Sequence, residues 1–122
     1  MKVLLSIKPQ FALKIFDGTK KFEFRKSVFK NSNINTVVVY ASSPMQKVIG
    51  EFTIAEIMEE EPEALWEMTK RHSGISKDFF DEYFFNRDRA FAIKVKDITR
   101  YKEPKELRDF DLNFAPQSFV YL

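Results

Sequence analysis

Apolar residues at the start of the chain change from a short continuous run to a helical spacing. Residues 3–7 form an almost wholly apolar run, which predicts a buried first strand. Pro9 suits the first turn of a helix, because its missing amide hydrogen would have no partner there. Apolar residues recur at helical spacing from Phe11 to Phe16, and Gly18 favours the left-handed conformation that ends helices. The pattern therefore predicts a strand followed by a short helix.

Three further strands are predicted before residue 60. Residues 21–25 alternate charged and aromatic side chains, and residues 36–41 are rich in β-branched side chains. Residues 48–58 are predicted to form a long strand, in which Gly50 indicates a bulge or a close approach of another segment.

The second half of the chain is predicted to contain two helices and two strands. Pro62 begins a helix that ends in the basic turn 70–72, and Ser76 is a good N-cap for the next helix. Residues 90–98 alternate as a strand does, and residues 119–122 are predicted to form the last strand. The predicted order β-α-β-β-β-α-α-β-β indicates an α+β fold.

Composition narrows the class of protein. A chain of 122 residues is long enough to bury about two-thirds of its unfolded surface, so one domain spanning residues 1–122 is expected. The chain has no cysteine and one histidine, which argues against disulfides and against thiolate or histidine metal sites, so neither metal nor cofactor is expected. The start of the chain lacks a signal-peptide core and no apolar run is long enough to cross a membrane. We therefore expect a cytoplasmic protein without membrane partners.

Charge points to a local anion site. The net charge is +2, from 20 basic and 18 acidic residues, which is too balanced for a protein that grips duplex DNA along its length. Basic residues nevertheless dominate residues 1–30, whereas residues 51–67 carry seven glutamates and no basic side chain. An acidic ligand would be attracted to the first region and repelled by the second.

The predicted strand 21–25 carries the densest candidate chemistry. Since side chains alternate along a strand, its two phenylalanines point to one side, and Lys21, Glu23 and Arg25 point to the other. Lys20 lies where the turn unwinds, so its side chain can reach either side. Such a cluster suits phosphate or an acidic ligand. A solvent-exposed ladder of opposite charges is the alternative interpretation.

Further polar candidates lie near the ends of two predicted strands. Ser6 and Lys8 share a strand face and precede the first helix, whose N-terminus favours anions. The alternative interpretation of Ser6 is that it only caps the entry turn. Tyr40 and Ser42 end the third strand, where a hydroxyl can read a nucleobase and an aromatic ring can stack on it. A Ser-Ser-Pro turn with a half-buried tyrosine is the alternative for this segment.

The spacing Gly-x-Lys-x-x-Glu-x-Arg, filled here by Gly18, Lys20, Glu23 and Arg25, resembles the signature of the ASCH domain family. Three more segments resemble recurring parts of that family in the same order, namely residues 4–9, 40–44 and 116–119. The resemblance implies a PUA-like fold, which is a small mixed β-barrel flanked by about three helices.

The resemblance also implies an RNA-associated module. Its ligand would be RNA, a nucleotide or a modified nucleobase, bound in a polar pocket beside the signature segment. The last two candidate residues come from the family's closing segment. The expected ligand-binding residues are Ser6, Lys8, Lys20, Glu23, Arg25, Tyr40, Ser42, Gln117 and Ser118.

Two alternative functions follow from the same resemblance. Some ASCH-like proteins are amidohydrolases that deacylate acetylated cytidine, and others are ribonucleases; Lys20 and Glu23 would be the catalytic residues here. The amidohydrolases have a threonine nucleophile where this chain has Glu23, and an assisting glutamate roughly where this chain has Ser73. Glu23 would then act as a base toward water while Lys20 polarises a carbonyl group. Other family members resemble transcriptional coactivators, and the acidic residues 51–67 would suit a basic protein partner.

Overall fold

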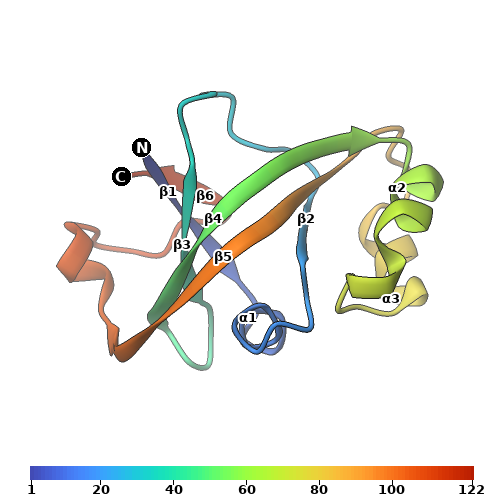
Figure 1. Ribbon diagram of the computed structural model, residues 1–122. Coiled ribbons are helices and arrows are strands. Elements are labelled where there is room, and N and C mark those ends of the chain that lie inside the picture. Colours follow the sequence, from blue (N-terminus) through green and yellow to red (C-terminus); the bar gives the residue numbers. More distant parts are fainter.

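The computed structural model describes residues 1–122 and shows a six-stranded sheet that curls into a half-barrel, with three helices around it (Figure 1). The strand order across the sheet is β2-β5-β4-β3-β1-β6. This mixed α+β arrangement confirms the predicted PUA-like fold. The elements are β1 (Lys2–Ile7), α1 (Pro9–Phe16), β2 (Phe22–Arg25), β3 (Thr36–Ala41), β4 (Lys47–Glu60), α2 (Pro62–Thr69), α3 (Lys77–Tyr83), β5 (Ala90–Lys105) and β6 (Phe119–Tyr121), with 3-10 turns at Lys70–His72 and Leu107–Phe110.

The sheet brings the two ends of the chain together. β1 runs parallel to β3 and antiparallel to β6, and the remaining neighbours are antiparallel. Val3 lies opposite Tyr121, and the Leu122 amide donates to the Lys2 carbonyl over 3.0 Å. Figure 1 shows the N- and C-termini side by side at one end of β1 and β6.

The first strand and helix form as predicted. Leu5 and Ile7 are buried in the main core, Pro9 is the first residue of α1, and Gly18 has a φ of 88° where the chain leaves the helix. The glycine relieves the Cβ crowding that this left-handed conformation imposes on other residues. The turn then directs the chain into β2.

β4 and β5 form a long twisted ribbon. The predicted irregularity at Gly50 is confirmed, because the register of β4 against both β3 and β5 shifts between Val48 and Gly50, and a Cβ at Gly50 would lie 2.6 Å from the Thr99 carbonyl oxygen. The predicted end of β5 at Ile98 is wrong, since the strand continues to Lys105. Pro104 has no amide hydrogen to donate to a neighbouring strand. Because β2 pairs only with the first part of β5, no hydrogen bond between β5 and β2 is lost at this proline.

Buried side chains form three separate cores. The largest lies between α1 and the concave side of the sheet and includes Ile15, Val39 and Phe52. A second lies beneath α2 and α3 around Phe80, and a third lies under the 3-10 turn at Leu107–Phe110. The gap between the first and second cores is where a cavity forms.

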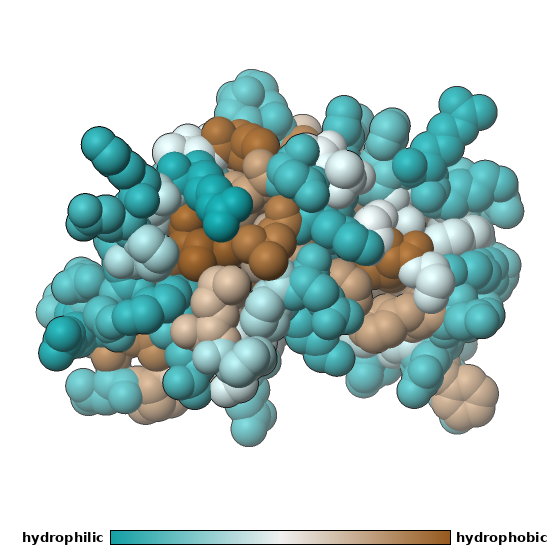
Figure 2. All heavy atoms as spheres, turned by 90° about the horizontal axis from the view of Figure 1, so that it is seen from below, coloured by the Kyte–Doolittle hydropathy of each residue, from teal (hydrophilic) through white to brown (hydrophobic).

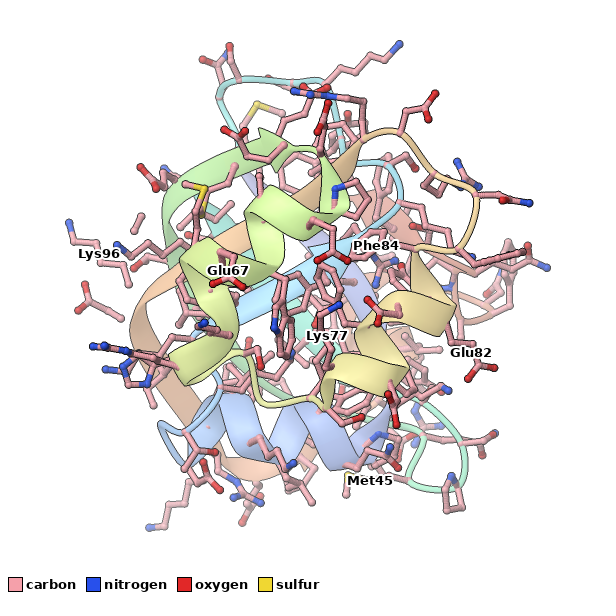
Figure 3. The ribbon with its side chains drawn as sticks, turned by 90° about the vertical axis from the view of Figure 1, so that its right-hand side faces the viewer. Met45, Glu67, Lys77, Glu82, Phe84 and Lys96 are labelled. Carbon is pink, nitrogen blue, oxygen red and sulfur yellow. The ribbon has the colours of Figure 1, made fainter.

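The two consecutive helices α2 and α3 cover one end of the sheet. Ser76 caps α3 by accepting a hydrogen bond from the Phe79 amide over 3.1 Å, as predicted. Figure 3 shows Phe84 pointing into the protein and Glu82 pointing to solvent, so the end of α3 buries one face. Lys77 links the helices through ion pairs with Glu63 and Asp81.

Hydrophilic side chains cover most of the face seen from below. Hydrophobic atoms reach that surface in two areas, separated by a hydrophilic band (Figure 2). None of the three helices is long and apolar enough to cross a membrane.

Candidate functional site

A cavity of about 420 Å³ lies where the end of β1, the start of α1, β2 and α3 meet. Its fifth wall is the segment that leads into β6. The volume lies in the range of small-molecule sites. The expected site residues among its lining are Ser6, Lys8, Lys20, Glu23, Arg25, Ser42 and Gln117.

Lys20 is the most deeply buried charged side chain of the cavity. It is only 2% exposed, and its Nζ donates a hydrogen bond of 2.6 Å to the Ser73 carbonyl oxygen. Nζ also lies 4.8 Å from the centre of the Phe24 ring and 5.4 Å from that of Phe11. The ammonium group is thus held between two aromatic faces and one carbonyl, where cation–π attraction compensates part of its lost hydration.

Burial lowers the pKa of Lys20 to about 8, from 10.5. The Glu23 carboxylate partly opposes this change, whereas the Lys14 cation adds to it. The side chain therefore changes charge near physiological pH, which makes it the most chemically distinctive group in the cavity.

Gly74 makes room for the Lys20 side chain. It has a φ of 70°, and a Cβ at this position would lie 2.6 Å from both Cβ and Cγ of Lys20. The Lys14 Nζ donates to the Gly74 carbonyl over 3.2 Å, which ties the same turn to α1. The turn after α2 therefore fixes the position of the buried ammonium group.

Glu23 and Arg25 form an ion pair at the cavity wall. Arg25 Nη1 lies 3.2 Å from Glu23 Oε2, and their side chains are 12% and 8% exposed. Arg25 also donates to the Ser6 carbonyl over 3.2 Å and to Ser118 Oγ over 2.7 Å. Three of the five guanidinium donors are thus used, and Glu23 Oε1 accepts no hydrogen bond from the protein. Both residues keep capacity for a ligand.

An aromatic wall faces these charged groups. The Phe11 and Phe79 rings meet edge to face at 5.1 Å, and the Phe79 and Tyr83 rings lie nearly parallel with centres 6.5 Å apart. Burial raises the pKa of Tyr83, which keeps its hydroxyl neutral. The sequence analysis did not select Phe79 or Tyr83, although their four-residue spacing after the Ser76 cap places both rings on one helix face.

The C-terminal segment closes the cavity. Ala115, Pro116 and Gln117 line it, and Ser6 Oγ donates to the Pro116 carbonyl over 2.6 Å. Ser118 lies behind this wall, where its hydroxyl holds Arg25. Gln117 thus lines the cavity directly, whereas Ser118 is connected to it through the Arg25 guanidinium group.

The expectation that Tyr40 lines the pocket is wrong. Tyr40 is 5% exposed and packs in the third core with Leu4, Val38 and Val48. Its neighbour Val39 faces the main core, so alternation along β3 turns the tyrosine to the opposite side of the sheet. Tyr83 is the tyrosine that lines the cavity.

Known proteins resemble this chain in sequence and fold. Large ribosomal subunit protein uL22 of Ureaplasma parvum is 29% identical over 120 residues, and ATP synthase subunit alpha of the same organism is 34% identical over 122 residues. The chain spans 39% and 15% of the lengths of these two relatives, with 98% of its own length matched in each. An ASCH domain-containing ribonuclease of Zymomonas mobilis is 27% identical, across 99% of this chain and 84% of the relative.

The crystal structure of ASCH from Zymomonas mobilis superposes with a TM-score of 0.91 at 27% identity, covering 99% of this chain and 87% of that one. The curled sheet with its three helices is therefore that of an ASCH domain, as predicted. The chain belongs to the family described as a domain of unknown function (DUF365), whose model matches residues 1–112.

Proposed function

We propose that residues 1–122 form one RNA-associated ASCH domain that takes a nucleobase, either unmodified or modified, into the cavity. The observation that carries this proposal is the convergence of Lys20, Glu23 and Arg25 on one hollow of about 420 Å³. The similarity to a protein named an ASCH domain-containing ribonuclease supports RNA as the class of ligand.

The cavity offers complementary groups for a base. Aromatic rings of α1 and α3 give stacking surfaces, which contribute about 1–3 kcal/mol per base in single-stranded complexes. Glu23 Oε1 accepts from a ring or exocyclic N–H, and the Lys20 ammonium donates to a carbonyl oxygen. Arg25 retains its Nε–H and one Nη2–H for a further acceptor.

Fluorescence anisotropy with short single-stranded RNAs tests the proposal. We expect saturable binding that falls about tenfold or more in Lys20→Met and in Glu23→Gln, since each loses a charged hydrogen bond to the ligand. Lys94→Gln is the matched control, because Lys94 is exposed on β5 and does not line the cavity. Absence of binding to every RNA at low salt, by protein with intact circular dichroism, would refute the proposal.

A hydrolase of the ASCH type is the second candidate, and the lowered pKa of Lys20 together with the unpartnered Glu23 oxygen favours it. The ammonium group would stabilise negative charge on a carbonyl or phosphoryl oxygen. The Glu23 carboxylate would take the proton of the attacking water or hydroxyl group. Both a deacylase for acylated cytidine and a ribonuclease fit these roles.

Incubation with N4-acetylcytidine, and separately with RNA, distinguishes these activities from binding alone. A hydrolase that uses the Lys20 ammonium should lose activity as pH rises above about 8, because the folded-state pKa of Lys20 is about 8. Lys20→Ala should remove turnover. Full activity in that variant, or no product from either substrate, would exclude the hydrolase.

A further inference from the structure

We infer that the rim of the cavity binds two phosphate groups, one through Lys8 and one through Lys26. The inference rests on the proposed function and restricts the class of ligand. The ligand unit would be a nucleotide that carries phosphate on both its 5′ and its 3′ side, such as an internal residue of a strand, instead of a free base or nucleoside.

The two lysines flank one aromatic wall. Lys8 immediately precedes α1, and its Nζ lies 5.4 Å from the centre of the Phe79 ring. Lys26 immediately follows β2, and its Nζ lies 4.9 Å from the centre of the Tyr83 ring. The two rings come from successive turns of α3 and lie nearly parallel, at an interplanar angle of 12°. Each ring thus carries one ammonium group, and both rings line the cavity.

Both ammonium groups are available to an anion. Lys8 and Lys26 are exposed, and neither forms an ion pair with a carboxylate, whereas Lys77 on the neighbouring helix is paired with both Glu63 and Asp81. A lysine acts toward phosphate as a mobile point charge on a flexible stem. Two such charges at the rim of one base-sized cavity match two phosphates that bracket one nucleotide.

The cation–π contacts hold each lysine only weakly, so its ammonium group can move from the ring to a phosphate. An ammonium group over a half-buried ring such as that of Phe79 or Tyr83 is held more weakly than one that donates charge-assisted hydrogen bonds to phosphate. A phosphate would therefore draw the ammonium off the ring and free the ring for a base or sugar. Phosphates would fix the register of the strand, while the groups inside the cavity contact the base.

The Tyr83 end of the wall carries two more cations and one anion. Arg25 and Arg87 lower the pKa of the Tyr83 hydroxyl, whereas Glu23 raises it. Because Arg25 and Glu23 are paired with each other, Lys26 and Arg87 are the unpaired cations at that end, and Lys26 is the one that lies over the Tyr83 ring. Lys26 is a binding residue that sequence analysis did not select.

Isothermal titration calorimetry with nucleosides, their 5′-monophosphates and their 3′,5′-bisphosphates, at about 50 mM salt, tests the inference. We expect affinity to rise with each added phosphate, by about tenfold per contact. Lys8→Gln and Lys26→Gln should each remove one step of this gain, measured relative to the nucleoside affinity of the same variant, and the double variant should remove both.

Lys96→Gln is the control, since Figure 3 shows Lys96 projecting on the side of the protein away from α3. Bisphosphates that bind no more tightly than nucleosides, or a full phosphate gain in the double variant, would overturn the inference and leave base binding intact. If neither nucleosides nor short RNAs bind, the proposed function itself fails and this inference fails with it.

Discussion

The buried Lys20 side chain lowers the stability of the fold and at the same time places a cation in the cavity. Its ammonium group is almost wholly enclosed, and the protein supplies one carbonyl and two aromatic faces as partners. Burial of a charge is costly unless it is well paired, and the lowered pKa expresses that cost. A protein under no functional constraint would be more stable with an apolar residue here.

This cost predicts a pH dependence of stability. The pKa of Lys20 is about 8 in the folded protein and 10.5 in the unfolded chain, so between these values the unfolded chain binds more protons. The free energy of unfolding should therefore rise with pH from about 8 to 10.5, by up to about 3 kcal/mol from this residue.

Urea denaturation of the protein and of Lys20→Met across that pH range measures the effect. The methionine variant should be the more stable of the two near pH 7, and the difference should shrink as pH rises. Two parallel stability curves would show that Lys20 does not titrate in this window.

Tyr83, and not Tyr40, should respond to the ligand. Tyr83→Leu removes a ring from the cavity wall and should weaken RNA binding by about 1–3 kcal/mol, the contribution of one stacked base. Tyr40→Phe keeps the ring in its core and should leave affinity unchanged. Anisotropy titrations of both variants provide the comparison, and a loss of affinity in Tyr40→Phe alone would contradict the assignment.

The sequence predicted part of this site at residue level. The spacing of Lys20, Glu23 and Arg25 sufficed to group them, because three residues within one turn and one strand cannot lie far apart. The inward direction of Lys20 was not predictable, since it depends on Gly74, which lies 54 positions away in the chain. Tyr83 was missed for the same reason: its helix reaches the cavity only through tertiary packing.

At the scale of elements, the turn that joins the second and third helices is a support for the site. Gly74→Ala should lower the free energy of unfolding by about 1–2 kcal/mol for the positive φ, plus about 1–3 kcal/mol for crowding of Lys20. It should also weaken ligand binding, because the lysine stem must move.

Gly18→Ala provides the matched control for this turn. Gly18 also has a positive φ, but a Cβ there would meet nothing within 4 Å, so only the first cost applies. Thermal unfolding and RNA binding of the two variants separate backbone strain from displacement of Lys20. Equal losses in both variants would show that the close contact has no effect.

Arg25 connects elements from opposite edges of the open sheet. It lies on the edge strand β2 and bonds to the end of β1 and to Ser118 just before β6. Arg25→Leu should lower the free energy of unfolding by about 3 kcal/mol, because it also leaves the buried Glu23 carboxylate unpaired.

Hydrogen exchange locates the effect of this substitution. The Ser6 amide, which donates to the Ser118 carbonyl, should exchange faster, whereas the Ser42 amide, which donates to the Ile7 carbonyl, should not. The double variant Glu23→Gln with Arg25→Leu should recover part of the lost stability. Unchanged exchange at Ser6 would mean that Arg25 does not hold the C-terminal wall.

Element bounds were largely predictable from local pattern, whereas strand neighbours were not. The third strand agrees to the residue at 36–41, because its β-branched run is bounded by turn residues. The extension of β5 to Lys105 depends on pairing with Val48 on β4, which is a long-range contact. The parallel pairing of β1 with β3 is likewise a property of the sheet as a whole.

Across the whole molecule, charge limits how RNA would be held. The net charge is only +2, and the glutamates of residues 51–67 oppose contact with β4 and α2. Two phosphate contacts imply a slope of log K against log salt of magnitude about 1.4. An RNA longer than a few nucleotides should therefore bind little more tightly. The only expected increase is statistical, because a longer RNA offers more equivalent positions for the same contacts. Salt titrations with RNAs of increasing length measure this, and a slope steeper than about 4 would indicate a broad basic groove instead.

The antiparallel pairing of the first and last strands gives this domain adjacent ends. A chain that enters at β1 leaves at β6 from almost the same point, so the fold can be inserted into a loop of a host protein without stretching it. A short linker from Leu122 to Met1, with new ends cut in the exposed loop at Ser32, should accordingly yield a circular permutant that keeps its cavity intact.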